Sequence, residues 1–225
     1  EAWVLQEATV ATGTIISKGD MRVGAGNQRG YHLKLNSSFP NLVWYDNAGV
    51  AQINLVSPYA ITNNRWYHIA STYDGTTVRL YIDGVEVANG APTAPPVNGS
   101  EKCLLGASYD STTPTVPKHY FDGFIDEVPV WNVGLTATQL HQMMNQEIEQ
   151  NGANVRGKVV PLDVSGGLAW TNLEGYYPMV NDRIQDQSSN SKHGAPKNIT
   201  TVELQTAPLP YVSVRNGEWG DVSAT

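Results

Sequence analysis

Two Asp-Gly dipeptides in the segment 64–89 constrain the fold more than any other feature of this chain. Asp74-Gly75 follows a run rich in aromatic and β-branched residues, and Asp83-Gly84 follows a run in which apolar and polar side chains alternate. A two-residue hairpin turn of type I′ needs positive φ at both positions, which Asp-Gly adopts readily. The segment therefore predicts three antiparallel strands, at 66–73, at 77–82 and from 85 onward.

Short apolar runs separated by Gly, Asn, Asp and Pro precede this hairpin. They lie at 2–5, 14–17, 31–35, 42–45 and 52–56. Strands this short, punctuated by turn residues at close intervals, are typical of two-sheet sandwiches and jelly rolls. We therefore expect an all-β protein, built as an antiparallel two-sheet jelly-roll sandwich with one short helix after the last core strand.

That helix is expected over 137–148. Thr136 suits the N-cap, and Gln139, three residues later, completes a capping box. Apolar residues then recur at helical spacing, with Leu140, Met143 and Ile148 among them. A stripe this short usually packs on the body of its own domain, so we expect it to cover the edge of the sandwich. A long strand at 120–131, interrupted near Gly123 and Pro129, is expected just before it.

Three motifs, in this order, resemble laminin-G-like, concanavalin A-like domains. They are EAWV at 1–4, the hairpin with WYHIA at 66–70 and LYIDG at 80–84, and GFIDEV at 123–128. The resemblance covers residues 1–150 and implies one laminin-G-like jelly-roll domain there, with Trp3, Trp66 and Trp131 at core positions. It says little about function, because this fold serves lectins, adhesins, spacers and some glycan-cleaving enzymes.

The sequence changes in character after residue 150. The stretch 175–194 is similar to the opening of the same family, but here it follows the core motifs instead of preceding them. The segment 151–225 is therefore a C-terminal extension that either docks on and completes the first domain or begins a second, truncated repeat. Because the chain opens inside a strand-like run, we expect a piece of a larger protein. The resemblance points to large secreted surface proteins of the Bacteroidetes type.

Charge and motif content argue against several classes of function. The formal net charge of −7 disfavours nucleic acid and anionic membranes as partners, and no stretch is apolar enough for membrane insertion. Glycosidases need two carboxylates flanking the scissile bond, and the E-x-D-x-x-E triplet that similar glucanases carry is missing. Motifs of serine hydrolases, zinc proteases and P-loop proteins are missing too. We therefore expect no enzyme; a glycan-cleaving activity is the least favoured reading.

Aromatic side chains beside polar groups are the candidates for sugar binding, because a ring can stack on the apolar face of a sugar. Trp44 and Tyr45 are neighbours on a predicted strand, so one of them is exposed if the other is buried. Tyr109 and Tyr120 flank a polar loop that contains Asp110. We expect these five residues to line a shallow sugar site. The alternative is that they cover the rim of a sheet.

Calcium is the predicted cofactor. It takes six to eight oxygen ligands from carboxylates, amides, carbonyls and water. The family resemblance implies that Asp126 lies near a calcium ion held with a loop that here contains Asp186 and Asn190. The alternative is that this loop is a solvated turn and that Asp126 accepts hydrogen bonds from backbone amides.

These observations predict a non-catalytic, extracellular adhesion module that binds a polysaccharide or glycoconjugate, with calcium as a candidate requirement. The alternative is a structural spacer or protein-interaction module that contacts neighbouring domains of the same chain. The aromatic surface separates the two readings. A lectin exposes at least one Trp or Tyr beside Asn, Asp or Gln, and a spacer need not.

Overall fold

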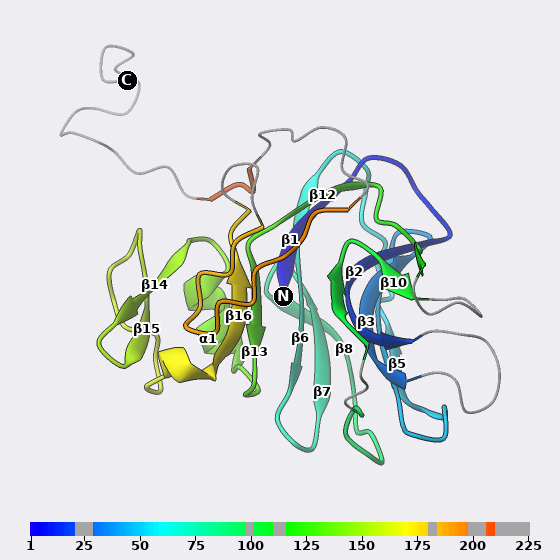
Figure 1. Ribbon diagram of the computed structural model, residues 1–225, viewed down its shortest axis with the longest axis horizontal. Helices are drawn as coiled ribbons and strands as arrows, with labels where there is room; N and C mark the ends of the chain where they lie inside the picture. Colours follow the sequence, from blue (N-terminus) through cyan, green and yellow to red (C-terminus); the bar gives the residue numbers. More distant parts are fainter. Residues whose placement is uncertain (21–28, 98–100, 110–115, 180–183, 198–205, 210–225) are drawn as a thin grey trace, which may run out of the picture.

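The computed structural model describes residues 1–225 apart from 21–28, 98–100, 110–115, 180–183, 198–205 and 210–225. Two β-sheets pack against each other (Figure 1). The first, sheet A, is antiparallel with the strand order β12-β1-β6-β7-β8. Its strands are β1 (Ala2–Gln6), β6 (Trp66–Tyr73), β7 (Val78–Ile82), β8 (Val85–Gly90) and β12 (Gly123–Asp126).

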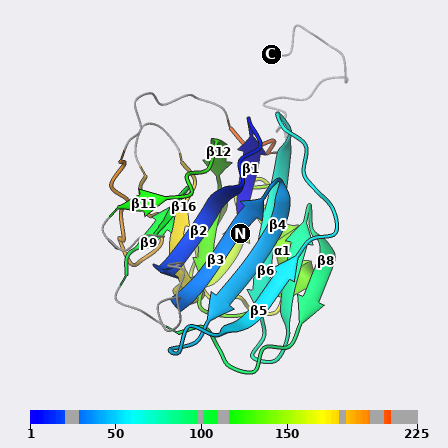
Figure 2. The same cartoon turned by 90° about the vertical axis from the view of Figure 1, so that its right-hand side faces the viewer.

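The second sheet, sheet B, has the order β11-β10-β2-β3-β4-β5, with β9 also paired to β2, and it is seen face on in Figure 2. Its pairs are antiparallel except for β10 and β2, which meet in parallel at one residue pair. The two-sheet sandwich is thus confirmed. The strands are β2 (Thr12–Asp20), β3 (Arg29–Asn36), β4 (Phe39–Tyr45), β5 (Ala51–Val56), β9 (Cys103–Leu105), β10 (Ser108–Tyr109) and β11 (Pro117–Lys118).

The main core lies between the two sheets. Ile69 and Leu80 of sheet A and Leu35 of sheet B are fully buried in it. Each such side chain contributes about 1.5–3 kcal/mol by leaving water. The hairpin turn has the expected form, because Asp83 and Gly84 both adopt positive φ, 48° and 76°.

A second core covers part of the opposite face of sheet A. Ala70 and Tyr81 alternate with the main-core residues on their strands and therefore point away from sheet B. They pack with a cluster that includes Leu140, Met143 and Tyr176. The elements of this part are β13 (Val128–Trp131), α1 (Ala137–Met143), β14 (Ile148–Asn151), β15 (Asn154–Gly157), η1 (Trp170–Asn172) and β16 (Leu173–Tyr177).

The helix begins where the capping box predicts and ends earlier than expected. Thr136 accepts from the Gln139 amide, and the Gln139 side chain accepts from the Thr136 amide. The helix stops at Met143, and Ile148 starts strand β14, although both side chains are buried in the second core. The long strand expected at 120–131 breaks into β12 and β13 at Glu127, whose φ is 48°, and not at Pro129.

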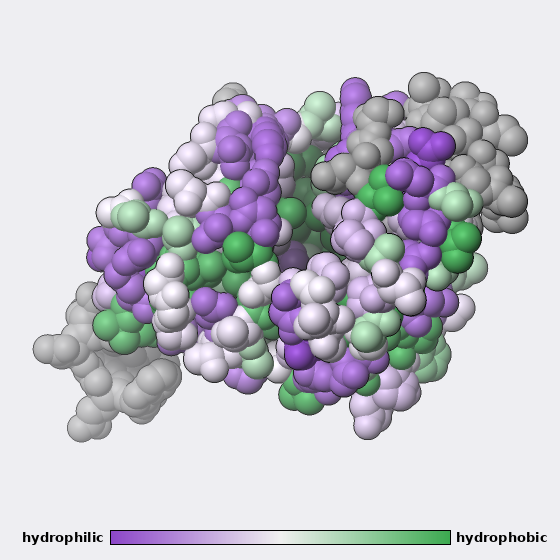
Figure 3. Space-filling view, turned by 90° about the horizontal axis from the view of Figure 1, so that it is seen from below, coloured by the Kyte–Doolittle hydropathy of each residue, from purple (hydrophilic) through white to green (hydrophobic). Residues whose placement is uncertain are grey.

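Residues beyond 150 also contact the first part of the chain through strand pairing and a hydrogen bond. Strand β16 pairs antiparallel with β13, bringing Tyr176 opposite Pro129. Farther along, the amide of Ala207 donates to Asp126 Oδ2 at 2.7 Å. From below, the molecule shows two lobes with a hollow between them (Figure 3). Among the described residues, no helix is long and apolar enough to cross a membrane.

Candidate functional site

The predicted sugar-binding aromatics do not gather at one place. Trp44 is 3% exposed, stacks edge-on against Tyr73 and donates from Nε1 to the carbonyl of Ala94 at 3.0 Å. Tyr109 is also buried. Strand β10, which carries Tyr109, is separated from β4, which carries Trp44 and Tyr45, by two strands. At a spacing of about 4.8 Å between strands, that places the two groups roughly 14 Å apart.

Two other predicted members of this site, Tyr45 and Tyr120, are accessible to solvent. Tyr45 is half-buried, its ring 6.4 Å from that of His32, and burial raises the pKa of its phenol. Tyr120 is 47% exposed. Asp110 lies outside the described residues. Of the five predicted residues, Tyr45 and Tyr120 are the two whose rings the structure leaves open to solvent.

The carboxylate of Asp186, a predicted calcium ligand, accepts hydrogen bonds from groups of the protein itself. Its Oδ1 accepts from the amides of Tyr176 and Ser188, at 2.9 and 2.8 Å. Its Oδ2 accepts from the Ser188 hydroxyl and the Lys192 amide, also at 2.9 and 2.8 Å. Burial raises the pKa of this carboxyl, but the hydrogen bonds outweigh burial and the net pKa is lowered. Four donors fill the four acceptor positions of a carboxylate, which leaves none for a cation.

The other two predicted ligands also make hydrogen bonds within the protein. Asp126 accepts from the amides of Glu127 and Ala207, and burial raises its pKa. The Asn190 side-chain amide donates to the carbonyls of Leu173 and Glu174. In the part of the chain that the structure describes, no three His, Cys, Asp or Glu residues form a group that could hold a metal. The described arrangement does not fit a calcium site at these residues, and calcium stays a prediction.

A surface depression of about 410 Å³ lies on the outer face of sheet A. It is lined by Trp3, Arg65, Trp66, Asp83 and Pro208. The strand register explains this grouping. Leu5 of β1 pairs with Phe124 on one side and with Trp66 on the other, and the neighbouring Val4 points into the main core. Because side chains alternate along a strand, Phe124 and Trp66 face outward on one row.

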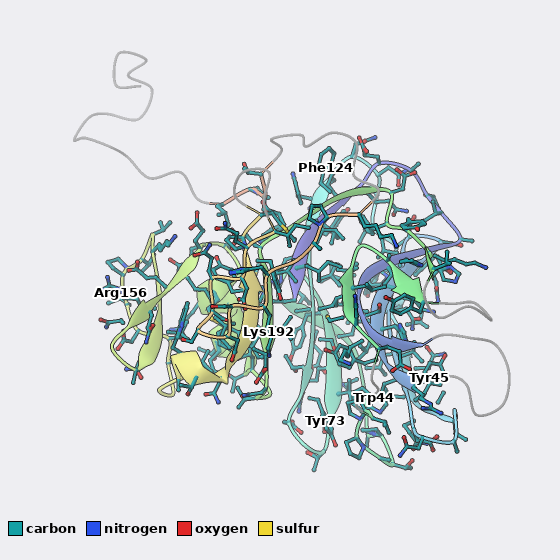
Figure 4. All side chains as sticks on the ribbon, in the orientation of Figure 1. Trp44, Tyr45, Tyr73, Phe124, Arg156 and Lys192 are labelled. Atoms are coloured by element: carbon teal, nitrogen blue, oxygen red, sulfur yellow. The ribbon has the colours of Figure 1, made fainter. Side chains whose placement is uncertain are left out.

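The depression, with Phe124 beside it, combines aromatic surface with a charged pair. The rings of Trp66 and Phe124 are 6.4 Å apart and inclined at 50°. Figure 4 shows Phe124 at the upper end of the molecule, away from Trp44 and Tyr45 at the lower right. Arg65 and Asp83 lie 4.0 Å apart, with 66% and 36% of their side chains exposed.

Both charged groups are held in place by the hairpin. The guanidinium of Arg65 sits 4.8 Å from the centre of the Tyr67 ring, a cation–π distance. Asp83 Oδ1 accepts from the amide of His68 at 2.8 Å. The site therefore presents two inclined aromatic rings, the Asp83 carboxylate as a hydrogen-bond acceptor and the Arg65 guanidinium as a donor. This combination suits a ligand with both apolar faces and hydroxyl groups.

The family resemblance placed Trp66 in the core, and the structure leaves it partly exposed on the outer face. Period-two alternation could have found it, because Tyr67 and Ile69 point into the main core and their neighbours Trp66 and His68 must point away. Phe124 carries no local signal of exposure. Pro208 could not be assigned at all, because its position depends on the fold of the C-terminal segment.

A buried acid lies nearby. Glu127 is 8% exposed, and the hydroxyl of Tyr176 donates to its Oε2 at 2.5 Å. Burial raises the pKa of Glu127 to about 8, and the negative charges of Asp126 and Glu147 add to the rise. The Tyr176 hydrogen bond and the positive charge of Lys158 offset only part of it. The raised pKa favours the protonated form of this acid at neutral pH.

Comparisons with known proteins bear on the fold. The sequence pattern of the Laminin_G_3 family, described as the concanavalin A-like lectin/glucanases superfamily, matches residues 1–141. Pappalysin-1 of Mus musculus is 31% identical over 81 residues, which are 34% of this chain and 5% of pappalysin-1.

Several solved structures resemble the chain, among them the following two. A proposed carbohydrate-binding protein from Bacteroides ovatus has a TM-score of 0.59 and 18% identity, covering 85% of this chain and 49% of that protein. The Ruminococcus gnavus IT-sialidase CBM40, bound to α2,3-sialyllactose, has a TM-score of 0.46 and 16% identity. The match covers 54% of this chain and 68% of that one. This chain therefore spans about half of the B. ovatus protein and a small part of pappalysin-1.

Proposed function

Because the chain belongs to the concanavalin A-like lectin/glucanase superfamily, we propose that it is a non-catalytic carbohydrate-binding module of an extracellular protein. The observation that carries the proposal is the depression on sheet A. It holds a partly exposed indole beside an aspartate, which is the surface expected of a lectin and not required of a spacer.

In this proposal the apolar face of a sugar stacks on Trp66, with Phe124 bounding it at an angle. Asp83 accepts hydrogen bonds from hydroxyl groups, and Arg65 donates to their oxygens. A sugar hydroxyl both donates and accepts, so the neighbouring acidic and basic groups suit it without a net charge on the ligand. The fold likeness to the proposed carbohydrate-binding protein of B. ovatus is consistent with this ligand class.

The arrangement of acids supports binding without cleavage. Among the described residues that line the depression, Asp83 alone carries a carboxylate. Glycoside hydrolysis by the usual mechanism requires two carboxyl groups flanking the bond. Asp126 and Glu127, the densest acids on the adjoining strands, are buried and engaged in hydrogen bonds within the protein.

We further propose that the C-terminal extension completes the first domain. Strand β16 pairs with β13, and Tyr176 contributes to the second core on sheet A. A separate repeat would instead bury its own strands against one another. Adhesion to a glycan surface, outside the cell and beside further domains of a longer chain, is the role that such a module would serve.

A glycan array tests the proposal. The full chain, Trp66→Ala and Tyr59→Ala are applied in calcium and again in EDTA. Tyr59 is a matched control, because it is an aromatic residue that is 65% exposed and does not line the depression. We expect the chain and the Tyr59 variant to bind the same glycans, and the Trp66 variant to lose them. If the folded chain binds no glycan, the spacer or protein-interaction role replaces this proposal.

A further inference from the structure

The C-terminal residues 206–209 lie on the outer face of sheet A, far along the chain from the strands they contact. Ala207 is 4% exposed, and its amide donates to Asp126 Oδ2 at 2.7 Å. Asp126 pairs with Trp3 in the register of β12 and β1, so the segment reaches the row of side chains that forms the base of the depression. Pro208 is consequently one of the residues that line it, together with Trp3 and Trp66.

The local chain conformation around Pro208 is compact. The amide of Leu209 donates to the carbonyl of Ala207 at 2.7 Å, which closes a three-residue turn centred on Pro208. The pyrrolidine ring fixes φ near the value that such a turn requires, so the turn forms with little further loss of entropy. An exposed proline ring held in this way is a rigid apolar surface.

Asp126 anchors this turn. Its Oδ1 accepts from the amide of the next residue, Glu127, at 2.9 Å, an interaction within its own strand end. Its Oδ2 accepts from Ala207, 81 residues away in sequence. This hydrogen bond ties the segment to the end of β12 through one backbone amide. A substitution at Ala207 that lacks the amide proton can remove it.

We propose that residues 206–209 form a wall of the depression, and that Pro208 restricts the site to the end or branch of a soluble glycan. This inference rests on the proposed carbohydrate-binding function. The rings of Trp66 and Phe124 are inclined at 50°, so a flat polymer surface cannot lie on both. Pro208, from the C-terminal segment, lines the depression that Trp66 also lines. A glycan end can enter such a cradle, whereas the face of a crystalline polymer cannot.

The test uses three variants of the full chain. Ala207→Pro removes the amide that donates to Asp126, and Pro208→Ala removes the ring. Ala195→Pro is the matched control, because Ala195 also precedes a proline, is exposed, and makes no hydrogen bond through its amide among the described residues. Each is measured with the soluble oligosaccharides of the array and with crystalline cellulose and chitin. Amide hydrogen exchange at Ala207 and acrylamide quenching of tryptophan fluorescence report on the wall without any sugar.

We expect the wild-type chain to protect the Ala207 amide and to bind soluble oligosaccharides in preference to both crystalline polymers. The Ala207 and Pro208 variants should bind roughly 5-fold more weakly or lose their preference for glycan ends, since each loses one apolar contact surface. Ala207→Pro should also raise quenching, because Trp3, now 6% exposed, becomes uncovered. Ala195→Pro should match the wild type.

Two results would overturn the inference alone. One is an Ala207 amide that exchanges freely in the folded chain. The other is unchanged affinity and unchanged glycan preference in both wall variants while the wild type binds sugar. A wild type that protects Ala207 but binds no glycan would instead overturn the proposed function, and the ligand assignment of the wall with it.

Discussion

Glu127 predicts a strong dependence of stability on pH. Its carboxyl is buried, and burial raises its pKa from the ordinary 4.5 to about 8. The folded protein therefore holds a proton that the unfolded chain releases between these two values. Stability from this group is fully present below pH 4.5, decreases as pH rises, and is lost once pH passes about 8.

The magnitude follows from the two pKa values. Each tenfold change in proton affinity is worth about 1.4 kcal/mol, so a rise from 4.5 to about 8 corresponds to at most about 5 kcal/mol between acidic and alkaline pH. Glu127→Gln removes the titration and keeps an oxygen that can accept from the Tyr176 hydroxyl. Relative to the wild type, we expect this variant to gain several kcal/mol between pH 5 and pH 9.

Urea unfolding at a series of pH values measures this effect. The other titrating groups are common to both proteins, so the difference between the two stability curves isolates Glu127. Glu149→Gln is the control, because Glu149 is a surface acid paired with Arg156. Parallel curves for the wild type and Glu127→Gln would refute the reasoning, since they would mean that the carboxyl titrates at its ordinary pKa in the folded protein.

The remaining predictions concern packing, the Asp186 loop and calcium. Gly84→Ala should lose about 1–3 kcal/mol more than Gly75→Ala in thermal unfolding, although both glycines have positive φ in Asp-Gly turns. A Cβ at Gly84 would lie 2.6 Å from the ring of His141, and one at Gly75 would meet nothing within 4 Å; equal losses would contradict the packing of α1 on this turn. Asp186→Asn should lose about 2–4 kcal/mol, because one acceptor oxygen becomes a donor facing buried donors, and an unchanged unfolding midpoint would contradict this. Glycan binding should survive EDTA, because the acceptor positions of Asp186 are filled, and abolition of binding by EDTA would contradict this and support the calcium prediction.

Much of the fold could be predicted because its signals are local. The Asp83-Gly84 turn, the alternation along 78–82 and the Thr136 capping box each depend on residues within a few positions of one another. The predicted C-terminal end of the helix was wrong, because packing in the second core and not local sequence decides where the helix stops. Ile148 continues the helical spacing, but its buried place in the second core is reached from strand β14.

The site was harder to predict because its residues meet only through the register of separate strands. Trp66 and Phe124 lie on β6 and β12, and both face outward because β1 pairs with each of them at Leu5. For Trp44, in contrast, the local pattern allowed either burial or exposure. The structure buries its side chain in the main core. The position of Pro208 depends on the hydrogen bond from the Ala207 amide to Asp126. No residue near Pro208 in the sequence predicts that bond.

The central claim is that a glycan binds at the depression on sheet A. Isothermal titration of Trp66→Ala and Phe124→Ala, with Tyr59→Ala as control, tests it most directly, using the soluble oligosaccharide that binds best on the array. We predict at least a roughly tenfold weaker Kd for Trp66→Ala and a smaller loss for Phe124→Ala, with unfolding midpoints close to that of the control. An unchanged Kd in both variants, with the wild type binding the same sugar, would place the glycan elsewhere and contradict the account.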